Sequence, residues 1–197
     1  MEYPKCFEEL ADCFKLLPGV GNKGAERNVY HILSMEPQLV ERFAKALLEF
    51  KENIQYCKKC GHICEGDLCD ICKDGQRDQS TICVVESPKD VFAMEKLKEY
   101  KGLYHVLHGT MSIMDGKTID DLNIASLFER IDENTKEVII ATNPTREGET
   151  TALFLARLLA KNNIPASRIA NGLPIGSNLD YADELTLLKS LEGRIKI

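Results

Sequence analysis

Four of the eight cysteines form two C-x-x-C pairs, Cys57 with Cys60 and Cys69 with Cys72. Each pair can place two thiolates on one metal ion through a tight turn, and two pairs complete a closed tetrahedral site. Redox dithiols usually carry a single C-x-x-C, so two pairs separated by eight residues favour a structural metal. We therefore predict one structural Zn²⁺ per chain, held by these four thiolates.

The other cysteines and one histidine need a separate interpretation. His62 and Cys64 lie between the two pairs and are the alternative zinc ligands. Cys6, Cys13 and Cys83 lie in apolar stretches, where a cysteine usually behaves as a small hydrophobic residue. We expect these three side chains to be buried.

Before the cysteines, apolar residues recur every three or four positions in three successive stretches. The first covers residues 7–17, the second runs from the following turn through Leu33, and the third covers residues 40–50. This spacing predicts three amphipathic helices. We expect the third helix to pack against the first two and complete a small helical module.

The turn between the first two helices, residues 17–25, has the sequence LPGVGNKGA. Gly19 and Gly21 allow a sharp turn and a close approach to phosphate, and the next helix offers its unpaired amides to that anion. Lys23 and Arg27, on one face of this helix, could hold adjacent phosphates. Because phosphates carry no base information, we predict sequence-independent DNA binding by these four residues.

Two alternatives exist for the same turn. It could be an ordinary corner between helices, with Lys23 and Arg27 simply solvated. Its glycines also match the dinucleotide fingerprint G-x-G-x-x-G, but that motif needs a preceding strand, and here a helix precedes it.

From Thr81 onward, short apolar runs alternate with stretches of helical spacing. This order predicts an α/β fold with a mostly parallel sheet and helices on both faces. A short strand-helix segment, with its helix over residues 181–191, follows the sheet. The predicted strands are residues 82–86, 103–108 and 137–142, and the predicted helices between and after them are residues 88–100, 119–131 and 149–161.

The net charge of −6 is unevenly distributed. Residues 1–60 hold 9 Lys or Arg and 9 Asp or Glu, whereas the rest of the chain holds 16 and 22. The first part could therefore face phosphates, and the acidic remainder suits a basic protein partner. The first residues mix charged and apolar side chains, so we expect a cytoplasmic protein with no membrane partner.

Polar residues follow two of the predicted strands, at the sheet edge where α/β proteins place their sites. Glu86 follows the first strand, and Asn143, Thr145, Glu147 and Glu149 follow the third. This part of the chain resembles a Toprim domain, the metal-dependent sheet of topoisomerases and primases. Catalytic members carry D-x-D where Asn143 and Thr145 stand. The loss of two of three carboxylates predicts that magnesium is not held firmly.

The hairpin, the zinc pairs and the degenerate Toprim domain, in this order, resemble the bacterial RecR family over essentially the whole chain. The resemblance also rests on four further segments: YKGLYHVLHG at residues 100–109, ATNP at 141–144, LEGR at 191–194, and a Walker B-like segment at 168–176 with Asp180. The chain departs from the family pattern at Asn22, Gly24 and Asn171. Gly24 is expected to loosen the start of the DNA-facing helix by about 0.5–1 kcal/mol relative to alanine.

The resemblance implies a recombination mediator in DNA repair. Such a protein acts with RecO and/or RecF to load a recombinase on gapped single-stranded DNA. It implies a homo-oligomer, a dimer or a tetrameric ring, that binds single- and double-stranded DNA. It also places Lys23 and Arg27 at basic DNA positions and Glu147 near the RecO contact. We assign Glu86 and Glu149 to the same partner-binding surface.

We expect four parts in the chain: a helix-hairpin-helix module at residues 1–53, a zinc finger at 54–78, a Toprim domain at 79–166 and a C-terminal segment at 167–197. We expect no catalytic residues. The main alternative is a magnesium-dependent Toprim nuclease or topoisomerase-like enzyme that uses Glu86, Glu147 and Glu149. A nucleotide-driven clamp is a second alternative, but the sequence contains no G-x-x-x-x-G-K-[ST] motif.

Overall fold

The computed structural model describes residues 3–112, 114–170 and 172–195. The chain divides into two compact units, Met1–Asn53 and Ile54–Ile197. Within the described residues, every helix is too short or too polar to cross a membrane.

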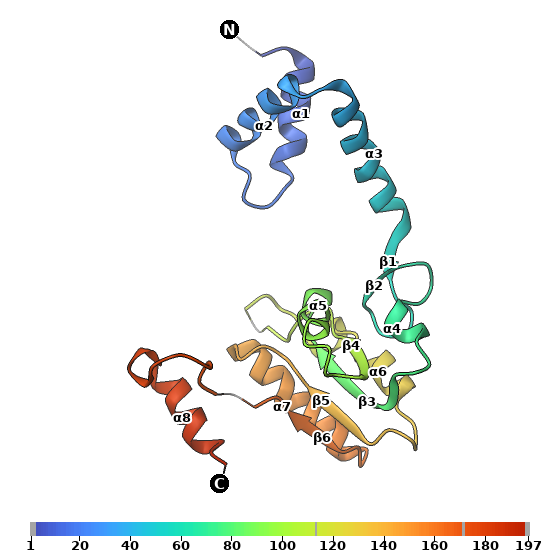
Figure 1. Cartoon of the computed structure of the whole chain (residues 1–197), viewed down its shortest axis with the longest axis vertical. Coiled ribbons are helices and arrows are strands. Elements are labelled where there is room, and N and C mark those ends of the chain that lie inside the picture. The colour runs from blue at the N-terminus through green and yellow to red at the C-terminus, as the bar shows by residue number, and fades with distance from the viewer. Residues whose placement is uncertain (1–2, 113, 171, 196–197) are drawn as a thin grey trace. The chain divides into compact units, whose positions relative to one another are not determined.

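The N-terminal unit consists of the helices α1 (Lys5–Lys15), α2 (Asn22–Ser34) and α3 (Pro37–Asn53), which confirms the three predicted helices (Figure 1). Its core lies between α1 and α2, where Ala11 packs against Ala25 and Val29. Small residues at these positions let the two helices approach closely, and larger apolar side chains of α1 cover the contact.

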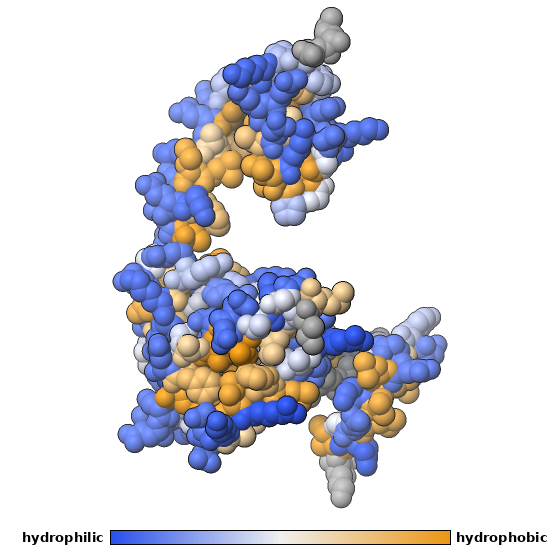
Figure 2. Space-filling model, turned by 180° about the vertical axis from the view of Figure 1, so that it is seen from behind, coloured by the Kyte–Doolittle hydropathy of each residue, from blue (hydrophilic) through white to orange (hydrophobic). Residues whose placement is uncertain are grey.

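The expected packing of α3 against this pair is wrong. No residue of α3 is buried, and none belongs to the core between α1 and α2. Met35 has an extended backbone, with φ −78° and ψ 150°, so the chain leaves α2 abruptly before Pro37 starts α3. The apolar side of α3 therefore remains exposed, and it contributes to the orange surface of this unit in Figure 2: Leu39, Phe43, Leu47, Leu48 and Phe50.

The second unit begins with a small element around the cysteines. Strands β1 (Ile54–Tyr56) and β2 (Ile63–Glu65) pair in antiparallel fashion, and a short helix, α4 (Asp70–Lys73), follows. The first cysteine pair lies in the connection between β1 and β2, and the second pair lies at the start of α4 and within it.

A four-stranded parallel sheet forms the main part of this unit, in the order β4-β3-β5-β6. Helices α6 and α7 pack on one face over Ile82 and Val138, while α5 packs on the other over Cys83 and Val85. The predicted mostly parallel α/β fold is therefore confirmed. The bounds are β3 (Asp78–Val85), β4 (Gly102–Val106), β5 (Glu137–Ile140), β6 (Ala166–Arg168), α5 (Pro88–Glu95), α6 (Ala125–Arg130) and α7 (Arg146–Lys161).

The helix predicted over residues 119–131 is interrupted. A 3₁₀ turn at Ile119–Asp121 is separated from α6 by residues that turn away from helical geometry. Asn123 donates its backbone N–H to the Leu107 carbonyl at 2.9 Å and its side-chain amide to the Val106 carbonyl at 3.0 Å. These bonds to the end of β4 take the place of hydrogen bonds within a continuous helix. A pattern of apolar residues cannot indicate such an interruption.

The burial predicted for three cysteines is only partly right. Cys83 is buried in β3, but Cys6 and Cys13 are exposed on α1. The side of α1 that carries Ala11 faces the core, and both cysteines lie beside that narrow stripe.

The last elements of the described chain form a short helical segment. A 3₁₀ turn (Leu179–Tyr181) precedes α8 (Glu184–Glu192), which is capped by the Asp183 carboxylate accepting from the Thr186 N–H at 3.0 Å. Three of its four leucines, Leu185, Leu188 and Leu191, are exposed.

Candidate functional site

The turn between α1 and α2 leaves its backbone open to an anion. Gly19 has φ +79°, which glycine adopts freely, and an added Cβ at Gly19 or Gly21 would meet no atom within 4 Å. Gly21 caps α2 without a side chain, and the first turn of α2 carries no acidic residue. The positive end of the α2 dipole and its unpaired amides therefore face open space.

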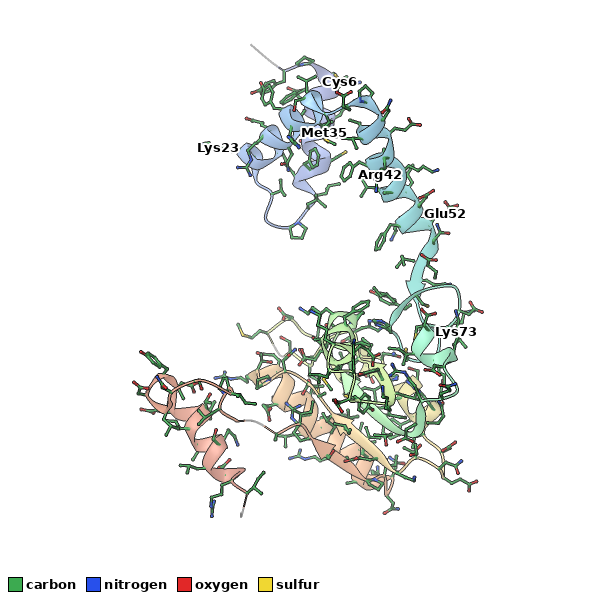
Figure 3. All side chains as sticks on the ribbon, viewed as in Figure 1. Cys6, Lys23, Met35, Arg42, Glu52 and Lys73 are labelled. Carbon is green, nitrogen blue, oxygen red and sulfur yellow. The ribbon has the colours of Figure 1, made fainter. Side chains whose placement is uncertain are left out.

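Lys23 and Arg27 lie on α2 beside this turn. Both side chains are exposed, and Figure 3 shows Lys23 on the outer side of the helix, close to the turn. Both cations can therefore reach the same extended polyanion that approaches the open amides.

The four predicted zinc ligands come together in space. The sulfur atoms of Cys57, Cys60, Cys69 and Cys72 all lie within 4.8 Å of one another. The first three cysteines are buried and Cys72 is half-buried. Four convergent thiols without a fifth ligand suit a closed tetrahedral Zn²⁺ site.

Hydrogen bonds of the local backbone hold the turn that positions these thiols. The Gly61 N–H donates to the Cys57 carbonyl at 2.8 Å, and the His62 N–H donates to the Cys60 sulfur at 3.4 Å. Hydrogen bonds from Cys60 and then Cys72 hold the pKa of the Cys69 thiol well below its usual range. One thiolate thus forms readily in the cluster, and a bound cation favours ionisation of the rest.

Neither alternative ligand joins the cluster. The Cys64 thiol donates to the Gly66 carbonyl at 2.9 Å. The His62 ring packs edge-on against Phe92 of α5, with ring centroids 4.8 Å apart. The ligand set is therefore the four cysteines.

The residues predicted at the carboxyl ends of the strands also lie close together. Asn143 donates its backbone N–H to Glu86 Oε1 at 2.7 Å and its side-chain amide to Oε2 at 2.6 Å. Thr145 caps α7 by accepting from the Gly148 N–H at 3.0 Å. Gly148 lies so close to Glu86 that an added Cβ at Gly148 would come within 2.8 Å of Glu86 Oε1. The two residues that replace the D-x-D carboxylates thus act as a donor to Glu86 and a helix cap.

The three acidic residues assigned to this edge differ in their partners. Glu149 pairs with Arg168 at 2.7 Å, and both Glu86 oxygens accept from Asn143. Glu147 makes no side-chain hydrogen bond or ion pair with any residue that the structure describes. Across residues 3–112, 114–170 and 172–195, the cysteine cluster is the one group of three or more metal-ligating side chains.

A buried polar network near this edge was not predicted. His105, in β4, is completely buried; its Nε2 lies 2.6 Å from the Asn123 carbonyl and its Nδ1 lies 3.3 Å from Arg130 Nη1. Burial lowers the pKa of His105 to about 4. The neutral ring thus donates from Nε2 and accepts at Nδ1. No periodic signal links residues so far apart in the sequence.

The Walker B-like segment begins at Arg168, the last residue of β6. Arg168 also donates to the Ile140 carbonyl at 3.0 Å, which ties the end of β6 to β5. Asn171, one of the departures from the family pattern, lies outside the described residues.

A helix-hairpin-helix unit, a four-cysteine zinc finger and a Toprim-type sheet in one chain define a class of multidomain DNA-handling proteins. Family models match every part: the RecR helix-hairpin-helix at residues 7–51, the RecR four-cysteine zinc finger domain at 54–74, the Toprim domain at 80–170 and the RecR C-terminal region at 172–195.

Full-length relatives agree with these matches. The proteins named Recombination protein RecR from Staphylococcus saprophyticus and Staphylococcus haemolyticus are each 52% identical over 198 residues, which covers 100% of this chain and of each relative. The chain belongs to the RecR family of recombination proteins. Its four clustered cysteines form the zinc site of the family's finger domain.

Proposed function

We propose that this protein is a DNA-binding recombination mediator, which acts with RecO and/or RecF to load a recombinase on gapped single-stranded DNA. One observation supports DNA binding most directly: the open amides of α2 lie beside exposed Lys23 and Arg27, with no acidic residue in the first helical turn. Such contacts recognise phosphates, so single- and double-stranded DNA should both bind, without base preference.

Charge reversal in the N-terminal unit tests this assignment. The Lys23→Glu, Arg27→Glu double variant should weaken DNA binding and reduce its dependence on salt, because fewer counterions are released. A matched control is Arg42→Glu, Lys51→Glu, which changes the same charge on α3. Unaltered DNA affinity in the Lys23→Glu, Arg27→Glu variant, or an equal loss of affinity in both variants, would show that the hairpin is not the DNA-binding site.

The acidic edge of the sheet is proposed as the docking surface for a basic partner. Glu86 and Glu149 are engaged by Asn143 and Arg168, whereas the Glu147 carboxylate has no hydrogen-bond or ion-pair partner among the described residues. Glu147 can therefore pair with a partner's cation without first losing an internal bond. The acidic excess beyond residue 60 should steer such a partner, so binding should weaken as salt rises.

Replacement of Glu147 by alanine should reduce association with a RecO-type protein, while DNA binding by the first unit persists. Glu133→Ala is the matched control, because exposed Glu133 precedes β5 and so lies at the opposite end of that strand. Equal partner affinity for wild type and Glu147→Ala would refute the docking assignment.

The mediator role requires no phosphoryl chemistry. The Glu86 carboxylate is occupied by two donors from Asn143, which favours docking over magnesium binding. The alternative, a Toprim nuclease, predicts strand cleavage of supercoiled plasmid with Mg²⁺ or Mn²⁺. Cleavage that Glu86→Gln abolishes would establish the enzyme and overturn the non-catalytic role.

A further inference from the structure

One turn of the zinc finger hydrogen-bonds to the edge strand of the sheet. Strand β4 is the edge strand, and its Val106 N–H donates to the Cys60 carbonyl at 2.8 Å. The Val106 carbonyl accepts the Asn123 side-chain amide at 3.0 Å. The metal-binding turn therefore satisfies the N–H, and Asn123 the carbonyl, of the last residue of the edge strand.

Gly61 lies where this turn meets the sheet. An added Cβ at Gly61 would come within 2.8 Å of His108 Nε2, 2.9 Å of the Asn123 side-chain amide and 3.0 Å of the Val106 carbonyl. Gly61 itself has φ +74°. Only a glycine thus brings the metal-binding turn this close to the residues that follow β4.

His108 has an unusual conformation at this contact. Its φ is +64°, in the left-handed region that non-glycine residues seldom occupy. Gly61 lies against one end of its ring, and the Tyr56 ring packs against it at an angle of 55°, with centroids 4.3 Å apart. Both neighbours belong to the zinc finger, so the finger packs against this half-buried, strained residue.

The conformation of His108 is connected directly to the docking surface. The next residue, Gly109, donates its N–H to the Glu86 carbonyl at 3.0 Å. Glu86 in turn accepts from Asn143 at the start of the α7 connection. A continuous chain of contacts therefore runs from the zinc-binding turn through His108 to the edge that carries Glu86.

We propose that Gly61 is a positioning residue: with Tyr56, it holds His108 in its left-handed conformation and thereby sets the geometry of the docking surface beside Glu86. This inference rests on the proposed docking function for its biological meaning. The zinc finger then has a second role besides stability. When its metal-binding turn holds a fixed conformation, the docking surface beside Glu86 also holds one.

Two glycines of the finger provide a matched test. Gly61→Ala and Gly66→Ala impose a similar backbone strain, since Gly66 has φ +86°, but an added Cβ at Gly66 meets nothing within 4 Å. With zinc still bound at one ion per chain, Gly61→Ala should accelerate hydrogen exchange at Val106, Gly109 and Asn123 by about tenfold. Gly66→Ala should leave these amides unchanged.

A second readout separates positioning from general stability. The imidazole resonances of His108 should shift in Gly61→Ala, because the ring leaves its place against Tyr56, and should stay unchanged in Gly66→Ala. If Gly61→Ala fails to retain zinc, Tyr56→Leu decides the matter, because it removes the ring contact and leaves the backbone bonds of the metal-binding turn in place. Unchanged Gly109 exchange in Tyr56→Leu, or equal effects of both glycine variants, would overturn the proposal.

Association with a RecO-type protein completes the test. Gly61→Ala should weaken it by about tenfold, and Gly66→Ala should not. Exchange and resonance shifts are measured without a partner, so they stand even if Glu147→Ala shows that the docking function is wrong. Faster exchange with unchanged partner affinity, where Glu147→Ala does weaken binding, would refute the control of docking by Gly61.

Discussion

The side-chain amide of Asn143 determines what the Glu86 carboxylate can do. An aspartate at position 143 would place a second negative charge beside Glu86, whereas the amide donates a hydrogen bond to it at 2.6 Å. A charged acceptor with donors on both oxygens needs no cation. Asn143 thus occupies both oxygens of the Glu86 carboxylate.

Asn143→Asp should therefore lower the free energy of unfolding by about 2–3 kcal/mol at neutral pH, because it removes a charge-assisted bond and adds repulsion. Millimolar Mg²⁺ should restore part of this loss by binding between the two carboxylates. Urea unfolding with and without Mg²⁺ measures both effects. Asn143→Ala is the control, since it loses the bond but gains no ligand; equal Mg²⁺ effects in both variants would contradict this account.

His105 gives the protein a specific sensitivity to acid. Its folded pKa of about 4, lowered by burial, lies below the ordinary value of 6.5. Below pH 6.5 the unfolded chain takes up a proton that the folded chain refuses, so stability falls as the pH decreases and the loss is complete near pH 4.

Between pH 7 and 5.5 this histidine should cost about 1 kcal/mol of unfolding free energy. Urea unfolding at both pH values should show that His105→Gln loses less stability on acidification than wild type by about that amount. His31→Gln, at an exposed position of α2, should behave like wild type. An equal loss of unfolding free energy on acidification in all three proteins would show that the lowered pKa of His105 does not cause the sensitivity to acid.

At the level of helices and strands, the glycine in the first turn of α2 is a local weakness. An added Cβ at Gly24 would lie 3.6 Å from Val20 Cγ1, an ordinary contact. Gly24→Ala should therefore stabilise the N-terminal unit by about 0.5–1 kcal/mol in urea unfolding. Gly21→Ala should do the opposite, because alanine is a poor N-cap residue. A destabilising Gly24→Ala would show that the turn needs glycine there for another reason.

The sequence predicts elements well where one face of an element is apolar and continuous. Helices α1 and α2 and the strands β3, β4 and β5 follow from period and composition, and the cysteine cluster follows from spacing. The short edge strand β6 is not among the predicted strands. The break before α6 depends instead on Asn123, whose bonds reach the end of β4. The bond between Asn143 and Glu86 likewise joins residues that follow two different strands, and only the folded sheet reveals it.

For the molecule as the structure describes it, each compact unit has a helix with exposed apolar side chains. Leu39, Phe43 and Leu47 are exposed on α3, and Leu185 and Leu188 are exposed on α8. Contiguous apolar surface of this kind usually marks a protein interface. A closed ring of identical chains with twofold symmetry needs two self-complementary surfaces on every chain, and the apolar sides of α3 and α8 are the candidates that we test.

If both surfaces pair with a second copy of the same surface, the wild-type protein should be a tetramer, and the loss of either surface should leave a dimer. We expect Phe43→Glu, Leu47→Glu on α3 to halve the mass measured by sedimentation, because charge in an apolar contact opposes burial. Leu185→Glu, Leu188→Glu on α8 should do the same, and all four changes together should give a monomer. Arg42→Glu, Lys51→Glu adds at least as much negative charge to α3 without removing apolar surface, so it should keep the wild-type mass. A wild-type monomer at micromolar concentration, with and without DNA, would show that neither surface serves assembly.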